Sequence, residues 1–265
     1  MSDDGATDPR SLLAPVLTIA RRAAAVIASL TAAPGQAAAQ RRKADGTPVT
    51  DADEAAEREI ETGLLALTPD VPIIGEEAAA AGSLPKVTGR YFWLVDPLDG
   101  TKEFLAGTPE YSVNIALVRD GVSVLGVIAQ PTSGRCWTGG VGMGAEEIDP
   151  DGTSRSLVAR AVPKQGAVVI TSSRVRAERL DAWIAANAVV APAKRTLGSS
   201  LKFCEIAAAR ADLYPRLGLT MEWDTAAGQA ILEAAGGQVL TPIGIPLAYG
   251  KPGYANAEFV ARGQT

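Results

Sequence analysis

A chain of 265 residues with 47% hydrophobic and 21% charged residues has the length and composition of a folded globular protein, large enough for two packed subdomains. A formal net charge of −5 argues against a protein that binds nucleic acid or anionic membranes through a broad basic surface. The chain contains no histidine, which excludes Ser-His-Asp triads, histidine-ligated zinc and phosphohistidine intermediates.

The two cysteines, Cys136 and Cys204, lie far apart in the sequence and form no Cys-x-x-Cys pair. This usage argues against a disulfide framework or a structural zinc site and fits a reducing compartment. We therefore expect a cytoplasmic protein, with peripheral attachment at the inner membrane as the alternative. Apolar residues at helical spacing across 13–27 predict a first helix, but no uninterrupted apolar run approaches the roughly 18 residues of a transmembrane helix.

A second helix is predicted to begin at residues 50–51, where a threonine and an aspartate can cap it. Apolar residues then recur at helical spacing across 56–67, and the first turn is acidic, which suits the positive end of the helix dipole. Within that turn Asp53 is, by itself, more simply a capping residue than a catalytic one. Glu76, which follows the short apolar segment 69–74, is by itself more simply a solvated acid at the end of a strand.

The most informative stretch begins with the aromatic and β-branched run 91–95, which predicts a buried strand. Pro97 should end this strand, because proline fixes its own φ and has no N–H to donate. The strand delivers Asp96 and Asp99 to its end, so both carboxylates can approach one point. Gly100 allows a close backbone approach, and the helix predicted after it offers free N–H groups to an anion. A cation and a phosphate can meet here, although an acidic turn without chemistry explains these residues equally well.

Further along the chain, strands are predicted over 111–118 and 122–129, joined by a tight turn, and 135–138 continues the same sheet. This pattern indicates a mixed, hairpin-rich sheet. The glycine-rich run 140–145 imitates a dinucleotide-binding loop, but it follows a hairpin and leads into no helix. A dinucleotide site is therefore rejected.

A break in composition at 149–156 divides the chain into a predicted N-terminal α+β subdomain, residues 1–155, and a predicted C-terminal α/β subdomain, residues 156–265. The second part is predicted to contain strands at 167–172, 189–193, 211–215 and within 237–246, and helices at 176–187, 201–210 and 222–235. Asp224, at the start of the last of these helices, is by itself more simply an N-cap than a functional residue.

Four motifs, taken in order, resemble those of the inositol monophosphatase superfamily of lithium-sensitive, magnesium-dependent phosphomonoesterases, and they span roughly residues 10–262. The motifs are Pro-Val-Thr-Asp-Ala-Asp at 48–53, Gly-Glu-Glu at 75–77, Trp-Leu-Val-Asp-Pro-Leu-Asp-Gly-Thr at 93–101 and Trp-Asp-Thr-Ala-Ala-Gly at 223–228. The resemblance implies the mixed α/β fold of that superfamily and of fructose-1,6-bisphosphatase, a layered αβαβα sandwich of two packed subdomains.

Within the superfamily, further runs are similar to those of bacterial 3′(2′),5′-bisphosphate nucleotidases. These enzymes remove the 3′-phosphate of adenosine 3′,5′-bisphosphate, a by-product of sulfate assimilation, and leave AMP. The runs lie at 102–104, 198–204, 213–216 and 222–228. We therefore expect a small nucleotide bisphosphate as substrate, no nucleic-acid partner and a monomer or homodimer. An inositol or sugar monophosphatase is the nearest alternative, and a non-catalytic nucleotide-binding regulator is an alternative of another class.

The resemblance implies a set of metal ligands. Two or three magnesium ions would be held by the carboxylates of Glu76, Asp96, Asp99 and Asp224 and by the carbonyl of Leu98. Magnesium prefers oxygen ligands and keeps bound water, so this set of groups suits the ion. Such a cluster can orient an attacking water and neutralise phosphate oxygens without any histidine.

The resemblance also assigns catalysis to Glu76, Asp53 and Thr101. The last two would act as a pair on the attacking water, which displaces the leaving group in line and without a phosphoenzyme. The phosphate would be held by the backbone N–H groups of Gly100 and Thr101.

Substrate choice depends on residues in the second half of the chain. Arg216 stands where inositol phosphatases carry an acid, and a guanidinium there suits a second phosphate. Ser199, Ser200 and Lys202 lie at the start of a predicted helix and can support the same anionic or ribose portion of a substrate. Capping of the helix explains the two serines equally well.

Overall fold

The computed structural model describes residues 8–30, 40–42, 48–191 and 193–264. Its helices are α1 Pro9–Ser29, α2 Asp51–Leu67, α3 Glu76–Ala80, α4 Thr101–Leu105, α5 Ala177–Ala186, α6 Leu201–Ala207 and α7 Ala226–Ala234, with a 3-10 turn, η1 Pro252–Tyr254.

Within these residues the strands form a seven-stranded sheet, a five-stranded sheet and two short pairs. The seven-stranded sheet contains, in spatial order, β3 Ile73–Gly75, β4 Tyr91–Asp99, β5 Ser112–Arg119, β6 Val122–Ala129, β7 Cys136–Gly140, β8 Gly144–Ile148 and β9 Ser154–Ser156. The five-stranded sheet contains β11 Ala193–Thr196, β10 Val168–Thr171, β12 Leu213–Arg216, β16 Phe259–Arg262 and β14 Gln238–Leu240. The pairs are β1 Gln40–Arg42 with β2 Pro48–Thr50, and β13 Thr220–Met221 with β15 Ala255–Asn256.

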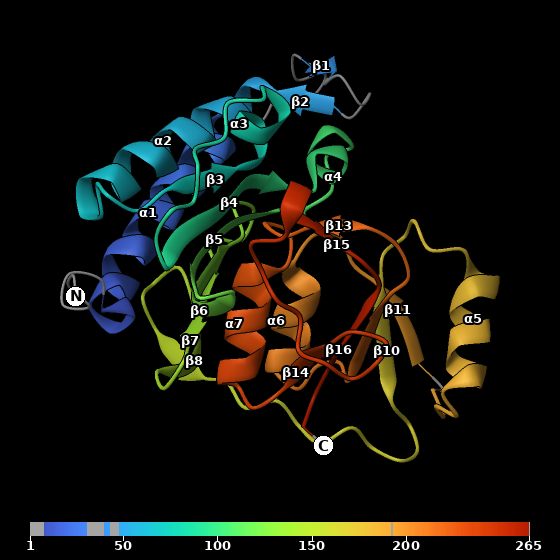
Figure 1. Cartoon of the computed structure of the whole chain (residues 1–265). Helices are drawn as coiled ribbons and strands as arrows, with labels where there is room; N and C mark the ends of the chain where they lie inside the picture. The colour runs from blue at the N-terminus through green and yellow to red at the C-terminus, as the bar shows by residue number, and fades with distance from the viewer. Residues whose placement is uncertain (1–7, 31–39, 43–47, 192, 265) are drawn as a thin grey trace.

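These elements stack as alternating layers of helix and sheet (Figure 1). Helices α1 and α2 cover one face of the seven-stranded sheet, α6 and α7 fill the space between the two sheets, and α5 covers the outer side of the five-stranded sheet. Because both faces of β4 are covered, Trp93 and Val95 pack toward α1 and α2 while Phe92 and Leu94 pack toward α6 and α7. The predicted αβαβα sandwich is confirmed.

Strand β4 does not end at Pro97, as the sequence predicted, but continues to Asp99. Its pairing with β5 is interrupted at the proline instead, because Asp96 lies opposite Asn114 and Asp99 opposite Ser112, so that two residues of β4 face one of β5. Proline cannot donate to the ladder, and a bulge accommodates it without ending the strand. The bulge leaves both aspartates at the same end of the sheet.

In the second half, one strand prediction needs correction and one strand was not predicted. The strand predicted at 189–193 is displaced, since β11 covers Ala193–Thr196, and β16, which lies between β12 and β14, was not predicted. Burial alternates along β16, where Phe259 and Ala261 are buried and Val260 and Arg262 are partly buried. This alternation is clear only once the neighbouring strands are known. The rejected dinucleotide loop is the turn between β7 and β8, and both cysteines are buried and free of disulfides. The division of the chain near residue 155 stays a prediction.

Helix α1 bears on the expectation that the chain has no transmembrane helix. Among the described helices, it alone is long and apolar enough to cross a membrane by length and composition, although no unbroken apolar run had suggested this. Its mean hydropathy over 18 residues stays high although the helix contains the charged pair Arg21-Arg22. In the fold, however, residues such as Val16, Ile19 and Ile27 are buried against α2 and the larger sheet, which is the environment of a core helix.

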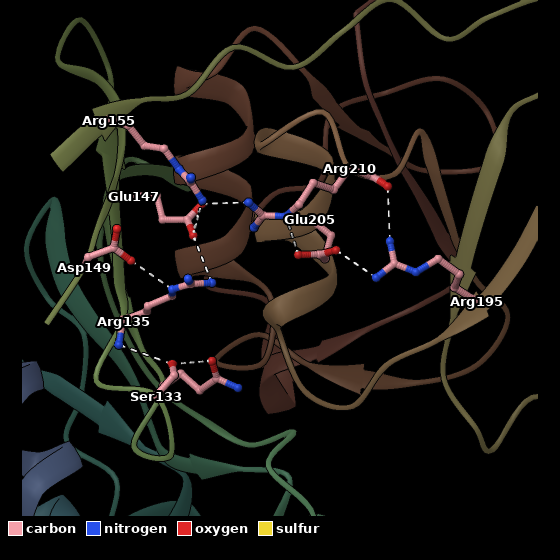
Figure 2. Close-up of polar contacts among 9 residues, drawn as sticks. Ser133, Arg135, Glu147, Asp149, Arg155, Arg195, Glu205 and Arg210 are labelled. Carbon is pink, nitrogen blue, oxygen red and sulfur yellow. Dashed lines mark hydrogen bonds and ion pairs between the residues drawn. The ribbon is translucent and has the colours of Figure 1, made fainter. Parts of the chain in front are cut away.

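A network of ion pairs joins the larger sheet to α6 and the smaller sheet (Figure 2). This arginine network consists of Arg135, Arg155, Arg195, Arg210, Glu147, Asp149 and Glu205. At its centre Glu147, whose side chain is 1% exposed, lies 2.7 Å from Arg155 Nη2 and 2.9 Å from Arg210 Nη1. The two arginines lower the pKa of Glu147 against the opposing effect of burial, so this buried carboxylate is held in its charged form.

Candidate active site

A cavity of about 650 Å³ lies where the end of β4 meets the starts of α3 and α4 and the segment before α7. Its lining includes every residue that the sequence predicted as a metal ligand, namely Glu76, Asp96, Leu98, Asp99 and Asp224. Strands β3 and β4 run parallel with Gly75 opposite Val95, so the residue after Gly75 arrives beside the β4 bulge. The structure therefore brings together acids that are far apart in the sequence.

Backbone groups orient two of these acids. Leu98 N donates a 3.0 Å hydrogen bond to Asp96 Oδ1, across the bulge itself. Met221 N donates a 2.8 Å hydrogen bond to Asp224 Oδ2, which places Asp224 ahead of α7 rather than at its N-cap, a position that Thr225 occupies. Local backbone geometry thus directs both carboxylates, while their other oxygens remain to act as ligands.

The carboxylates affect one another strongly. Burial raises the pKa of Asp96 well above its ordinary value, and the charges of Glu76, Asp99 and Asp224 raise it further. Burial likewise raises the pKa of Asp224 to about 8, with Asp99 and Glu76 adding to the effect. The pKa of Asp99 is also raised by burial, although the charge of Lys202 opposes this. The three aspartates therefore resist ionisation until positive charge arrives.

The donor set fits a hard cation. Among the described residues, no three acidic, cysteine or histidine side chains already close around a common point as a metal-binding group. The raised pKa values of Asp96, Asp99 and Asp224, to each of which the charge of Glu76 contributes, nevertheless show that these carboxylates repel one another, and repelling carboxylates stand apart until a cation draws them together. Carboxylate and carbonyl oxygens without nitrogen or sulfur are the ligands that magnesium prefers.

Thr101 and Asp53 lie together although they are 48 residues apart in the sequence. Thr101 Oγ1 is 3.2 Å from Asp53 Oδ1 and 3.2 Å from the carbonyl oxygen of Leu98, so its single proton can be donated to either. Asp53 Oδ2 accepts hydrogen bonds from Thr50 N at 2.8 Å and Thr50 Oγ1 at 2.6 Å, which completes a capping box at the start of α2. Asp53 is therefore both a helix cap and the partner of Thr101.

Gly100 separates the acids of β4 from helix α4. Its φ of 102° lies in the left-handed region, and a Cβ there would stand 3.1 Å from Glu110 O and 3.1 Å from Tyr111 Cβ. Only glycine suits this conformation and this close approach. Gly100 and Thr101 both line the cavity, and the first N–H groups of a helix lack intrahelical partners, so the turn offers backbone donors to an anion.

The other predicted substrate residues line a second, smaller cavity of about 70 Å³. These residues are Ser199, Ser200, Lys202 and Arg216. The two cavities share Asp99, Gly100, Arg174 and Asp224, so they meet at the acids. The structure thus places the predicted metal and substrate residues in adjoining spaces.

Ser200 has structural partners. Its hydroxyl donates a 2.6 Å hydrogen bond to Asn114 Oδ1 and lies 2.9 Å from Ser112 Oγ. Asn114 Nδ2 in turn donates to Asp99 Oδ2 at 3.4 Å. The Ser200 hydroxyl therefore helps to hold Asn114, which in turn holds the Asp99 carboxylate. Ser199, in contrast, adopts a φ of 48° at the turn before α6.

Lys202 and Arg216 are also engaged with their surroundings. Lys202 is 4% exposed, donates to the carbonyls of Leu197 and Ser199, and lies 5.1 Å from the centre of the Tyr214 ring. Burial lowers the pKa of Lys202 to about 8, partly offset by the charge of Asp99. Arg216 donates to two carbonyls of the loop that follows it, at 3.2 and 2.6 Å.

Sequence analysis missed Glu57, which is buried one helical turn after Asp53. Its two oxygens accept hydrogen bonds from Glu77 N and Ala78 N, each at 2.9 Å, and burial raises its pKa to about 6. Glu57 therefore anchors the first turn of α3, which carries Glu76. The sequence could have indicated this residue, because Glu57 is an acid four residues after Asp53 on the apolar side of a predicted helix.

An apolar wall of the larger cavity was also missed. It contains Leu84, Met221, Trp223 and Tyr254, and the two aromatic ring centres are 6.3 Å apart. Such a surface suits a planar or apolar part of a ligand, opposite the polar acids. Tyr254 comes from η1, far beyond the motifs, so sequence reasoning had no signal for it.

Comparisons with known proteins agree with this geometry. The family model of the inositol monophosphatase family matches residues 8–263. The 3′(2′),5′-bisphosphate nucleotidase CysQ of Escherichia coli (strain K12) is 42% identical over 207 residues, which cover 78% of this chain and 81% of that relative. The inositol-1-monophosphatase of Mycobacterium bovis is 31% identical over 225 residues, which cover 83% of this chain and 77% of that relative.

A similar structure has also been solved. The crystal structure of CysQ from Bacteroides thetaiotaomicron, described as a bacterial member of the inositol monophosphatase family, superposes with a TM-score of 0.77 at 29% identity. The superposition covers 96% of this chain and 98% of that one. Fold, site and sequence comparisons agree, and this chain belongs to the inositol monophosphatase family.

Proposed function

We propose that this protein is a magnesium-dependent phosphomonoesterase that converts adenosine 3′,5′-bisphosphate to AMP and phosphate. The observation that carries the proposal is the convergence of Glu76, Asp96, Asp99 and Asp224 on one cavity, beside the backbone turn at Gly100. The 42% identity to a relative named as a 3′(2′),5′-bisphosphate nucleotidase supports the choice of substrate.

The acids of the cavity would hold the metal. When bound, magnesium, expected as two or three ions, supplies positive charge that neutralises the phosphate oxygens and activates the attacking water. Glu76, Asp96, Asp99 and Asp224 would hold it through carboxylate oxygens, with the carbonyl of Leu98 as a further ligand. The Leu98 oxygen has two lone pairs, so it can serve as a ligand and still accept from the Thr101 hydroxyl.

Thr101 and Asp53 would direct the attacking water. When the Thr101 hydroxyl donates its proton to Asp53 Oδ1, the Thr101 oxygen is left to accept a hydrogen bond from a water. This contact turns the lone pair of the water toward the phosphorus atom and gives its proton a path to Asp53. Glu57 and the capping box keep the two ends of this arrangement in place.

The phosphate would be held by the backbone N–H groups at Gly100 and Thr101, in line with the attacking water. Little covalent chemistry is required of the protein in phosphoryl transfer, so positioning and electrostatic stabilisation account for most of the rate. No phosphoenzyme is needed, and the absence of histidine excludes a phosphohistidine intermediate in particular.

Two alternative functions can be weighed against this proposal. An inositol or sugar monophosphatase is favoured by the 31% identity to the relative named inositol-1-monophosphatase. A non-catalytic nucleotide-binding regulator, in contrast, has no need for four acids in one cavity, so the intact acid set argues against it.

A phosphate-release assay with magnesium tests the proposal. Adenosine 3′,5′-bisphosphate, adenosine 3′-monophosphate, inositol 1-phosphate and a sugar phosphate are compared at equal concentrations, with and without chelator. We expect kcat/KM to be highest for the bisphosphate, activity to vanish with chelator, and lithium to inhibit. A clear preference for inositol 1-phosphate would replace the proposal with its nearest alternative, and no turnover of any substrate would support the regulator.

A further inference from the structure

Helix α2 carries two buried carboxylates one helical turn apart, and each contacts a different segment of the site. Asp53 and Glu57 are four residues apart, so they lie on the same face of the helix. Asp53 contacts Thr101 at the start of α4. Glu57 contacts the start of α3, the helix that carries Glu76. A single helix therefore touches both the pair assigned to the attacking water and the segment of a proposed metal ligand.

The short helix α3 receives its cap from α2. Its five residues are partly buried or exposed, and a helix of this length is marginal by itself. Its N-cap is Gly75, which has no side chain to accept from the free N–H groups of the first turn. Glu57 accepts instead from Glu77 N and Ala78 N, each at 2.9 Å, and these are the N–H groups that an N-cap side chain ordinarily serves. The Glu57 carboxylate also lies at the positive end of the helix dipole.

Gly75 shows how closely Glu57 fits against α3. The backbone of Gly75 has a φ of −98° and a ψ of 155°, an extended conformation that any residue can adopt. The conformation therefore does not require glycine. A Cβ at this position would lie 2.7 Å from Glu57 Oε1 and 2.8 Å from its carboxyl carbon, which is closer than atoms in contact approach. The missing side chain at Gly75 makes room for the Glu57 carboxylate.

The two helices joined by Glu57 differ in how firmly the core holds them. Helix α2 buries Ala56, Ile60 and Leu64 completely, against α1 and the larger sheet. Glu57 is 5% exposed and extends from this fixed helix to the first turn of α3. Glu76 directly precedes the two N–H groups that Glu57 holds, so the position of its carboxylate depends on the contact. Residues that orient a metal ligand from outside affect metal affinity strongly.

We propose that Glu57 is a positioning residue that sets the affinity of the cavity for magnesium, by capping α3 from α2 and so holding Glu76 in place for the metal. This inference rests on the proposed function, because it presumes that Glu76 is a metal ligand. The contact between Asp53 and Thr101 does not involve Glu57. Loss of Glu57 should therefore weaken metal binding and leave the rate of the fully loaded enzyme nearly unchanged.

The test is thermal unfolding in a magnesium titration without substrate, in wild type and Glu57→Gln. Glutamine has one acceptor oxygen in place of two, and its amide group would face a backbone N–H. We expect the magnesium concentration for half-maximal stabilisation to rise about tenfold or more. At saturating magnesium, kcat should stay within about twofold of wild type. The matched control is Glu61→Gln, which removes a negative charge one turn further along α2 and should leave the half-maximal concentration unchanged.

Gly75→Ala tests the same contact without any change of charge. The added methyl group would displace the Glu57 carboxylate, so this variant should also raise the half-maximal magnesium concentration. In Glu57→Ala the space beside Gly75 is open, and the methyl group should then have no further effect. The double variant Glu57→Ala/Gly75→Ala should therefore match Glu57→Ala alone. Additive effects of the two changes would show that the residues act independently and would overturn the inference.

The outcomes separate this inference from the proposed function. If Glu57→Gln lowers the Tm in chelator but leaves the half-maximal magnesium concentration unchanged, Glu57 supports only the fold, and the inference is wrong although the proposed function stands. An equal rise in Glu61→Gln would attribute the effect to net charge, which also overturns the inference. If magnesium does not stabilise wild type at all, the proposed metal site fails and this inference with it.

Discussion

Two buried groups of carboxylates in this protein have opposite electrostatic surroundings. Asp96 in the cavity and Glu147 in the arginine network are both 1% exposed, and burial alone would raise the pKa of each. For Glu147, Arg155 and Arg210 reverse that effect and the pKa falls, whereas the neighbours of Asp96 are further acids, and its pKa rises well above the ordinary value. The state of a buried acid therefore depends on its neighbours, and burial alone does not decide it.

The difference separates a structural site from a binding site. The arginine network contains its own cations and needs nothing from solution (Figure 2). The acids of the cavity repel one another, which stores unfavourable energy that a bound cation would relieve. An uncompensated cluster of acids in a cavity is thus a functional signal, while a compensated one is a signal of stability.

The largest effect should come from Asp99→Asn in the cavity. Loss of a carboxylate ligand should lower kcat/KM roughly 10³-fold or more, because the metal ions contribute several kcal/mol of charge stabilisation. Phosphate release measures this, and the Tm in the presence of chelator should stay the same or rise. Asp120→Asn, at an exposed turn with Arg90, is the matched control and should keep full activity. Activity within tenfold of wild type in Asp99→Asn would contradict the metal site.

Glu147→Gln should act on stability and leave the chemistry intact. Removing the central charge weakens the contacts with Arg155 and Arg210, which are exposed enough to be hydrated, so the free energy of unfolding should fall by about 2 kcal/mol. Urea denaturation measures this loss, and kcat at 25 °C should match wild type. Glu146→Gln, its exposed neighbour on β8, should change stability by less than about 0.5 kcal/mol. If Glu147→Gln and Glu146→Gln were equally stable, the arginine network would not be a stabilising site, and its contrast with the cavity would be lost.

Magnesium should stabilise the folded protein through the cavity acids alone. At 100 times its Kd, a ligand that binds only the folded state adds about 2.7 kcal/mol to the free energy of unfolding. Thermal unfolding in chelator and in magnesium measures this increase. We expect it in wild type and in Glu147→Gln but not in Asp99→Asn, and an undiminished increase in Asp99→Asn would place the metal elsewhere.

The two regions should also respond to pH with opposite sign. Without metal, the folded pKa of Asp224 is about 8 and its ordinary value is 3.8, so the folded state binds more protons between these values and stability should fall as pH rises through that window. The lowered pKa of Glu147 gives the reverse, with stability complete above 4.5 and lost as pH falls through the folded pKa.

Scans of Tm against pH in chelator test this contrast. Wild type should lose a few degrees between about pH 5 and 8, and Asp224→Asn should lose less. Magnesium should remove the dependence, because it holds the acids in their charged form. A metal-free Tm that rises steadily with pH over this range would contradict the shift at Asp224.

The smallest effect should come from the outer edge of the arginine network. Glu205 pairs with Arg210 at 2.7 Å and with Arg195 at 3.0 Å. The Glu205 side chain is 16% exposed, whereas that of Glu147 is 1% exposed. Glu205→Gln should lower the free energy of unfolding by about 0.5–1 kcal/mol, as expected for partly solvated pairs. Urea denaturation should rank it well below Glu147→Gln, and an equal loss would show that burial does not set the strength of these pairs.

Much of the fold and site follows from local sequence. The continuous apolar run of β4, the capped amphipathic helix α2 and the glycine turn before α4 depend on spacing and on the properties of single residues, so they can be predicted without knowledge of their neighbours. The order of the motifs identified the acids that the structure brings to one cavity, because the motif residues are those that the chemistry requires. The boundary at Pro97 was wrong, since a bulge depends on the partner strand.

The tertiary structure alone decided how those residues are used. The sequence predicted that Arg216 binds a second phosphate and assigned no role to Glu57. The hydrogen bonds of Arg216 to loop carbonyls, and of Glu57 to the start of a distant helix, have no signature in residue spacing. Likewise, Asp96 and Glu147 are equally buried, but their pKa values shift in opposite directions. The difference comes from the charges of neighbouring residues on other elements. The sequence by itself determined which chemical groups are available, and the tertiary structure decided their charge and exposure, since both depend on distances between segments far apart in the chain.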